Sequence, residues 1–126
     1  MRECLVVDDS RTVRRVARRM LEARGFSVRE AEDGKQALEA CRAAMPTLVL
    51  LDWNMPVMDG ITFLRHAREE FGPDEPQIML CTTESDFSRI VVALEGGAQE
   101  YIMKPFDDAI LASKLEVLGL LPDEAA

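Results

Sequence analysis

The sequence predicts an α/β fold in which a five-stranded parallel sheet is covered by helices on both faces. Short apolar runs alternate with amphipathic stretches five times along the 126 residues, and the connections between them are short. Parallel strands need a crossover, which a helix supplies, and right-handed crossovers place helices on both sides of the sheet. We find no linker, repeat or low-complexity segment, so we expect one domain over residues 1–121 and a short tail at 122–126.

Each predicted strand is a short apolar run bounded by turn signals or polar residues. The clearest is Leu48–Asp52, where four apolar residues after Pro46-Thr47 predict a strand buried on both faces, with a carboxylate at its end. Phe26–Glu30 alternates apolar and polar residues instead, which is typical of an edge strand. The other strands are expected at Cys4–Val7, Pro76–Cys81 and Tyr101–Met103.

The predicted helices carry apolar residues at three- and four-residue spacing, and they are expected at residues 11–24, 34–45, 61–71, 87–95 and 108–118. The apolar face of the first is predicted to be Val13, Val16, Ala17, Met20 and Leu21. Its opposite face carries Arg11, Arg14, Arg15, Arg18 and Arg19. The apolar side of the fourth helix is predicted to be Phe87, Ile90, Val91 and Leu94, and that of the last to be Ile110, Leu111, Leu115 and Leu118.

Composition and charge argue against several kinds of function. Fifteen basic and twenty-three acidic residues give a net charge of −8, which disfavours nucleic acid or an anionic membrane as a direct partner. The opening residues reach two acids after a short apolar run, so we do not expect them to act as a signal peptide, and no run approaches the roughly twenty apolar residues of a membrane span. Cys4, Cys41 and Cys81 are widely spaced and lack His or Cys neighbours, so we expect buried thiols in a reducing cytoplasm.

Polar residues stand at the ends of four of the five predicted strands. They are Asp8 and Asp9 after the first, Asp52 at the third, Thr82 after the fourth and Lys104 after the fifth. The carboxyl ends of parallel strands share one edge of the sheet, where ligands bind in open α/β folds. We therefore expect these side chains to lie around one crevice.

Three carboxylates at close range repel one another, which raises the pKa of one or more of them. A hard divalent cation removes this repulsion. Mg²⁺ prefers oxygen ligands and is typically held by one or two carboxylates and a phosphate, which fits a pocket without His or Cys. Lys104 and the Thr82 hydroxyl would bind oxygens of a transferred phosphoryl group, and Asp52 would accept that group covalently.

These residues resemble the receiver domains of two-component response regulators. Asp8-Asp9, Asp52, Thr82 and Lys104-Pro105 match the pattern of that family, and the match covers the whole chain. The stretch Leu51–Gly60 is more specific and most resembles the stand-alone chemotaxis response regulators. The resemblance implies a flavodoxin-like, doubly wound sheet of order 2-1-3-4-5, for which a chemotaxis regulator is itself a standard example.

The resemblance implies that Asp52 takes a phosphoryl group from a phosphohistidine on a histidine kinase or a histidine phosphotransfer protein. It also implies Mg²⁺ bound by Asp9, Asp52 and the backbone carbonyl of Asn54, with Asp8 acting through water. The Lys104-Pro105 peptide is expected to be cis. Such a protein is a signalling switch that catalyses its own phosphorylation and dephosphorylation and no other reaction.

The resemblance further implies a conformational switch. Thr82 would turn toward the phosphoryl group and Tyr101 would move inward behind it. This would change the surface of the predicted fourth helix, fifth strand and fifth helix, where a protein target binds. Asn54 and Glu84 occupy variable positions that affect phosphoryl hydrolysis, and their chemotaxis-like identity implies a short-lived signal. Thr83 departs from the usual Ala or Gly, and its side chain either crowds the phosphoryl site or adds a hydroxyl.

Several alternatives remain open. A motility switch and a phosphorelay intermediate or phosphate sink would use the same site with different partners, and the chain could also be a receiver cut from a DNA-binding regulator. An aspartyl-phosphate phosphohydrolase is disfavoured because Asn54 cannot serve as its second acid. A flavodoxin-like electron carrier is disfavoured because Asp8-Asp9 would repel the phosphate of FMN.

Three further residue sets have a structural and a functional interpretation. The arginine face of the first helix is either a docking face for an acidic helix bundle or a solvated face balanced by nearby acids. His66 is expected on the surface rather than as a phosphate carrier. Trp53, beside Asp52, is expected to report on the site rather than to catalyse.

Overall fold

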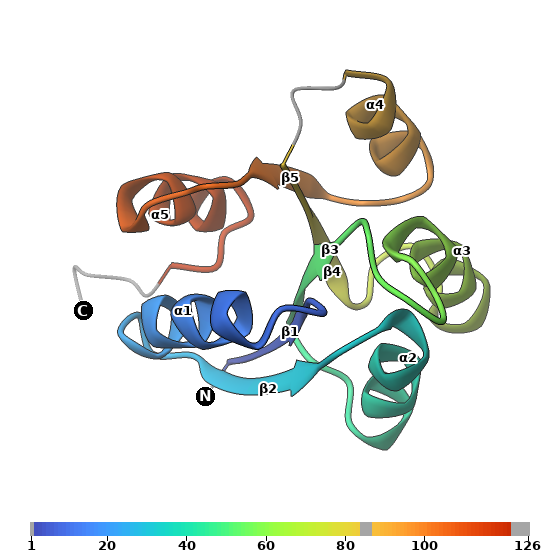
Figure 1. Cartoon of the computed structure of the whole chain (residues 1–126), viewed down its shortest axis with the longest axis horizontal. Helices are drawn as coiled ribbons and strands as arrows, with labels where there is room; N and C mark the ends of the chain where they lie inside the picture. Colours follow the sequence, from blue (N-terminus) through green and yellow to red (C-terminus); the bar gives the residue numbers. More distant parts are fainter. Residues whose placement is uncertain (1, 84–86, 122–126) are drawn as a thin grey trace.

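The structure, a computed structural model, describes residues 2–83 and 87–121 and contains one five-stranded parallel sheet (Figure 1). The strands are β1 (Glu3–Val7), β2 (Ser27–Ala31), β3 (Leu48–Asp52), β4 (Gln77–Thr82) and β5 (Glu100–Met103). Their order is β2-β1-β3-β4-β5, and every neighbouring pair is parallel. The predicted fold class and strand order are thereby confirmed.

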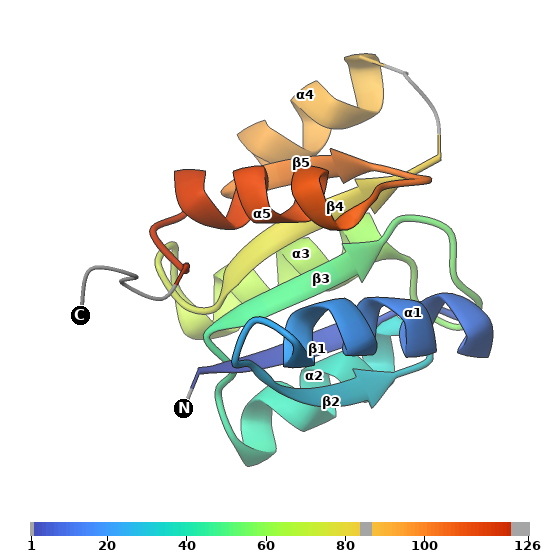
Figure 2. The same cartoon turned by 90° about the vertical axis from the view of Figure 1, so that its left-hand side faces the viewer.

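The helices of the described residues are α1 (Arg11–Glu22), α2 (Gly34–Ala43), α3 (Gly60–Phe71), α4 (Phe87–Glu95) and α5 (Asp108–Val117). Helices α1 and α5 cover one face of the sheet, and α2, α3 and α4 cover the other (Figures 1 and 2). Short polar side chains cap the starts of four helices by accepting backbone N–H groups, and these caps are Ser10, Asp33, Asp59 and Asp107.

The hydrophobic core consists of two layers, one on each face of the sheet. Alternate residues of one strand contribute to different layers, as Val49 and Leu51 lie on the α2–α3 side and Leu48 and Leu50 on the α1–α5 side. All five residues of β3 are buried, as predicted for the central strand. The sheet is thus fixed from both sides, and its carboxyl edge becomes a rigid platform.

The predicted orientation of α1 is wrong for two residues. Arg14 is buried, and Val16 is 48% exposed. The helix packs on the sheet through Ala17 and Leu21, while Arg14 reaches the end of β1 and binds the side chain of Glu30. Apolar spacing could not reveal this, because a buried arginine depends on the acceptors that tertiary structure provides.

The predicted apolar side of α4 is also largely wrong. Ile90 is buried together with Ala93, but Phe87 is 79% exposed, and Val91 and Leu94 are exposed as well. This helix covers the edge of the sheet, so it presents a narrow contact face, and its apolar residues outnumber the positions that the sheet can cover. Helix α4 therefore carries apolar surface to solvent.

The remaining sequence predictions on thiols and membranes have clear outcomes. Cys4, Cys41 and Cys81 are buried free thiols, and burial raises the pKa of Cys4 and Cys81 to about 12 and that of Cys41 to about 11. No helix among the described residues has the length and apolar character needed to span a bilayer. The predicted tail at 122–126 lies outside the described residues.

Candidate functional site

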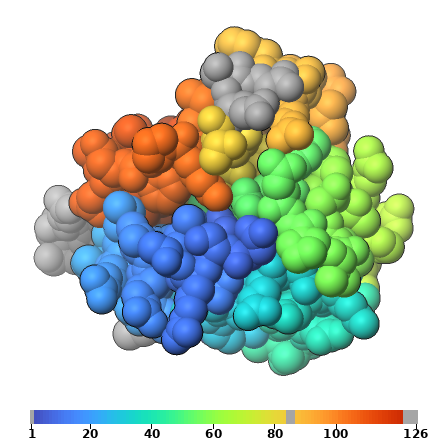
Figure 3. Space-filling model, in the orientation of Figure 1, coloured from blue at the N-terminus to red at the C-terminus, as the bar shows by residue number. Residues whose placement is uncertain are grey.

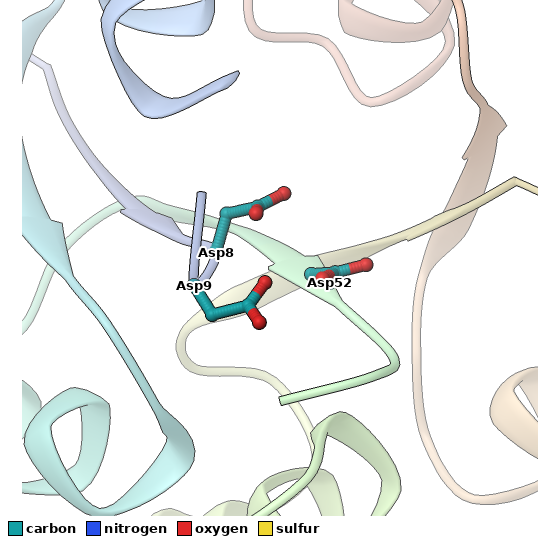
Figure 4. Close-up of side chains that lie close together, drawn as sticks. All are labelled: Asp8, Asp9 and Asp52. Atoms are coloured by element: carbon teal, nitrogen blue, oxygen red, sulfur yellow. The ribbon is translucent and has the colours of Figure 1, made fainter. Parts of the chain in front are cut away.

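Three carboxylates converge at the carboxyl edge of the sheet (Figure 4). Asp8 follows β1 and Asp52 ends β3, and the register that pairs Val7 with Leu51 places the two side by side. Asp8 and Asp52 are buried, whereas Asp9 is exposed. One oxygen of each carboxylate lies within 4.8 Å of the others. The space-filling view shows this edge, where the start of α1, the end of β4 and the loops after β3 and β5 meet around a hollow (Figure 3).

Lys104 connects the two buried carboxylates. Its Nζ donates to Asp8 Oδ2 at 2.7 Å and to Asp52 Oδ1 at 3.3 Å. Burial alone would lower the pKa of Lys104, but the hydrogen bond to Asp8 and the negative groups nearby leave it raised. The side chain is therefore a fixed cation between two acids from different strands.

The Asp52 carboxyl group has a raised pKa. Burial is the largest cause, and the neighbouring charge of Asp8 adds to it, with a smaller contribution from Asp9. The charge of Lys104 and its hydrogen bond act in the opposite direction. The contributions of Asp8 and Asp9 are the repulsion that the sequence predicted, and an added cation would relieve that part of the shift.

Asp8 is held by a backbone N–H and by Arg14, which the sequence analysis placed on the arginine face of the first helix and not at the site. Its Oδ1 accepts the N–H of Ser10 at 2.8 Å, and its backbone oxygen accepts Nη1 of Arg14 at 2.6 Å. Burial alone would raise the pKa of Glu30, but hydrogen bonds from Arg18 and Arg14 hold it below its ordinary value. In the sequence, an acidic residue near the end of the adjacent strand β2, Glu30, was the one sign that an arginine of α1 could be buried with an ion-pair partner.

The loop after β3 is tied closely to the phosphoacceptor candidate. Gly60 begins α3 and donates its N–H to the oxygen of Trp53 at 2.9 Å. A Cβ at this position would overlap the backbone oxygen of Asp52, so the close approach requires glycine. This contact gives a physical reason for the glycine that closes the Leu51–Gly60 stretch.

Trp53 is covered by a second residue that the sequence analysis missed. The guanidinium carbon of Arg89, in α4, lies 5.1 Å from the centroid of the Trp53 ring, within the range of a cation–π contact. The two residues are 36 positions apart by number, and no motif pairs them. The contact links α4 to the residue that follows Asp52.

The ends of β4 and β5 bring Thr82 and Lys104 together. Thr82 is buried, and its backbone oxygen accepts the N–H of Lys104 at 2.7 Å. The Lys104–Pro105 peptide is cis. Thr83 is exposed and lines a cavity of about 470 Å³ between α1 and the start of the β5–α5 loop. The rest of that lining is Thr12, Val13, Val16, Ala17, Lys104, Pro105 and Phe106.

The other predicted site residues lie on the loop after β3, on β5 and outside the described residues. Asn54 is exposed in the loop after β3, and Tyr101 is partly exposed on β5. Glu84 lies outside the described residues. His66 is exposed on α3, as expected of a surface histidine. The roles of Asn54, Tyr101 and Thr83 remain predictions.

Comparison with known proteins identifies the family. Residues 4–116 match the response regulator receiver domain. The chain belongs to this family. The receiver domain is 41% identical over 116 residues to the chemotaxis protein CheY1 of Helicobacter pylori, covering 90% of this chain and 94% of that protein. It is 39% identical over 125 residues to a CheY homolog of Campylobacter jejuni, covering 97% and 96%.

Solved structures support the same assignment of fold. The chemotaxis response regulator CheY4 of Vibrio cholerae superposes on this receiver domain with a TM-score of 0.85 at 30% identity, covering 96% of this chain and 99% of that one. A response regulator of Chloroflexus aurantiacus gives a TM-score of 0.85 at 28% identity. The chain is thus similar to chemotaxis regulators over nearly their whole length.

Val57 lies in the same loop as Asn54 and has a backbone conformation that its side chain disfavours. Its φ is 68°, in the left-handed region, and its side chain is 79% exposed. Val57→Asn should raise the free energy of unfolding by about 1 kcal/mol, because asparagine tolerates this conformation and no core contact is lost.

Urea unfolding measures this difference as a shift in midpoint at constant slope. Val57→Ala is the matched control, and it should gain less because alanine lacks the short polar side chain with which asparagine hydrogen-bonds locally in the left-handed region. Equal stability of the Asn variant and the wild type would contradict the assigned strain.

Proposed function

We propose that this receiver domain accepts a phosphoryl group on Asp52 and signals by binding other proteins, in a chemotaxis-type pathway. The carrying observation is the position of Asp52, which is buried at the end of β3, bridged to Asp8 by Lys104 and clustered with Asp8 and Asp9. The similarity to curated chemotaxis proteins supports the pathway. The buried free thiols fit a reducing cytoplasm.

Among the three carboxylates, Asp52 is best suited to be the acceptor. Both oxygens of Asp8 already accept hydrogen bonds, from Ser10 and Lys104. Asp52 accepts a hydrogen bond from Lys104 through Oδ1, and no hydrogen bond from the described residues reaches its Oδ2. Its raised pKa makes the carboxylate more basic and so a better nucleophile.

The proposed reaction moves one phosphoryl group from a histidine nitrogen to an oxygen of Asp52. An oxygen of Asp52 attacks the phosphorus of a phosphohistidine on a histidine kinase or phosphotransfer protein. The new P–O bond forms as the P–N bond breaks, and the electron pair returns to the imidazole, which takes up a proton. Lys104 stays within reach of the phosphoryl oxygens and offsets their charge. We assign the domain no reaction beyond its own phosphorylation and dephosphorylation.

The carboxylate cluster fits Mg²⁺. All of its donors are oxygens and lie within 4.8 Å of one another. Burial raises the pKa of Asp52 most, and the charges of Asp8 and Asp9 add a repulsion that a cation would relieve. Asp9 and Asp52 would hold the ion with the backbone carbonyl of Asn54, and Asp8 would act through water. When bound, the ion supplies positive charge to phosphoryl oxygens.

The output surface is proposed to lie on α4, β5 and α5. Apolar side chains are exposed on all three elements, and they include Phe87, Val91, Met103, Ile110 and Val117. Exposed apolar groups that are gathered on neighbouring elements mark protein interaction sites. A phosphorylation-dependent target would bind there.

The input surface is proposed to lie on α1. Arg14 and Arg18 are paired with acids, whereas Arg11, Arg15 and Arg19 form no ion pair within the described residues and line a common groove. Thr12 and Val16 belong both to this groove and to the apolar cavity beside Lys104. An acidic, histidine-bearing helix bundle fits a surface that is basic along one side and apolar beside the site.

Asp52→Asn should abolish phosphorylation by acetyl phosphate or phosphoramidate in the presence of Mg²⁺, because the amide removes the nucleophilic carboxylate. Intact-mass spectrometry measures the adduct. Asp33→Asn makes the same change of charge at the cap of α2, where asparagine also caps well, and it should label normally. A labelled Asp52→Asn protein would refute the proposed acceptor.

Mg²⁺ should quench the fluorescence of Trp53, the chain's one tryptophan. Trp53 directly follows Asp52, which is one of the proposed ligands of the ion. Asp9→Asn should weaken the apparent affinity at least about tenfold. Asp33→Asn serves again as the control. Quenching of equal affinity in the Asp9 variant would remove Asp9 from the metal site.

A motility switch and a phosphorelay intermediate or sink differ in the fate of the phosphoryl group. Purified phosphorylated protein mixed with an unphosphorylated histidine kinase domain should lose its label mainly by hydrolysis if it is a switch. Transfer back to the kinase histidine faster than hydrolysis would instead assign the relay or sink role. Autoradiography of both proteins over time separates the two.

A further inference from the structure

Tyr101, the chain's one tyrosine, lies in a compact network at the exposed edge of the sheet. Strand β5 is an edge strand, so it has a neighbouring strand on one side alone. The N–H of Tyr101 donates to Oε1 of Glu100 at 2.8 Å. The same oxygen accepts Nζ of Lys114 at 3.2 Å, and that Nζ lies 3.9 Å from the centroid of the Tyr101 ring.

We propose that Lys114 is a positioning residue that holds the Tyr101 ring in its partly exposed position, with Glu100 as the anchor of Lys114. The functional meaning of this contact rests on the proposed function, in which phosphorylation draws the ring inward. The contact itself does not depend on phosphorylation. Lys114 would then set how readily the domain leaves its resting state.

The anchor explains why a lysine can hold a ring at this site. A free lysine side chain samples many rotamers, so a contact with one ring position would be weak. Here the Glu100 carboxylate is fixed by the N–H of Tyr101, and it fixes Nζ of Lys114 in turn. The side chains of Lys114 and Glu100 are 22% and 15% exposed, so solvent screens their ion pair less than it screens a surface pair.

The arrangement favours one ring position over the other. In the observed position the ammonium group contacts both the carboxylate and the ring. If the ring moves inward, the ion pair with Glu100 persists and the contact with the ring is lost. A contact that exists in only one of two states changes the equilibrium constant between them by an amount set by its free energy. For a partly exposed cation–π pair, this change is about two- to fivefold.

The two elements that carry this network also belong to the proposed output surface. Lys114 lies in α5 and Glu100 in β5, which run side by side (Figure 2). Met103 and Ile110, on the same two elements, are exposed. Release of Lys114 from the ring would therefore change the surface that a target would contact.

Fluorine NMR of the protein labelled with 3-fluorotyrosine tests the contact directly, because a single tyrosine gives a single resonance. In the unphosphorylated protein, Lys114→Met should shift the resonance, and Lys114→Arg should restore it because arginine keeps the charge and the ring contact. Glu100→Gln should shift it in the same direction as Lys114→Met, since the amide oxygen still accepts the Tyr101 N–H but, being uncharged, holds the cation more weakly. Lys35 is an exposed lysine of α2, and Lys35→Met is the control because it changes the net charge by the same amount as Lys114→Met.

Beryllofluoride with Mg²⁺, a phosphoryl mimic, tests the effect on the switch by titration against Trp53 fluorescence. Lys114→Met and Glu100→Gln should bind it about two- to fivefold more tightly than the wild type, Lys114→Arg and Lys35→Met. A resonance in both Lys114→Met and Glu100→Gln that matches the Lys35→Met control would overturn the proposed contact. Unchanged affinity despite a shifted resonance would overturn the role in the switch.

These outcomes are separable from a failure of the proposed function. If the wild type binds no beryllofluoride and takes no label from acetyl phosphate, the phosphorylation proposal falls and the switch role of Lys114 falls with it. The fluorine resonance of the unphosphorylated variants still decides whether Lys114 holds the ring.

Discussion

The charge balance between Lys104 and the acids of β1 and β3 is the interaction on which the site depends. Two buried carboxylates side by side would otherwise be driven to take up a proton. Lys104 reaches both of them, at 2.7 Å and 3.3 Å, so one cation holds the ends of three strands in register. Lys104 does not fully offset the effects that raise the pKa of Asp52. A further cation bound at the site would lower this pKa again.

The backbone makes this balance possible without strain in the strands. Parallel pairing sets Asp52 opposite Cys81 and Thr82 opposite Met103, so each polar residue reaches the edge as its strand ends. The loop after β3 must then leave room, and Gly60 does so where a Cβ would strike Asp52. The strained φ of Val57 falls in this same loop, close to the proposed ligand Asn54 and away from the core.

The sequence predicted the fold class and the carboxylate cluster because both follow from local patterns, whereas the strand order came from the family resemblance. Apolar runs mark the strands, and polar residues at their ends meet wherever parallel strands share an edge. Arg14 could not be placed in this way, since its burial depends on Asp8 and Glu30 from two other elements. Periodicity misjudged Phe87 and Val16 for a related reason, because it counts apolar residues without knowing how much partner surface is available. The Lys114 network joins residues that no motif connects.

Strand β5 is the element that joins the proposed phosphorylation site to the proposed output surface. It is followed directly by Lys104, which binds Asp52, and three residues before Lys104 it carries Tyr101, which contacts Lys114 of α5. Its backbone is paired with β4 on one side alone, so displacement of β5 disturbs fewer contacts than displacement of a central strand. Any phosphoryl group on Asp52 would compete for the ammonium of Lys104 at one end of this short strand. The consequence would reach Tyr101 through four residues of backbone, with Lys114 and Glu100 setting the resistance at the other end.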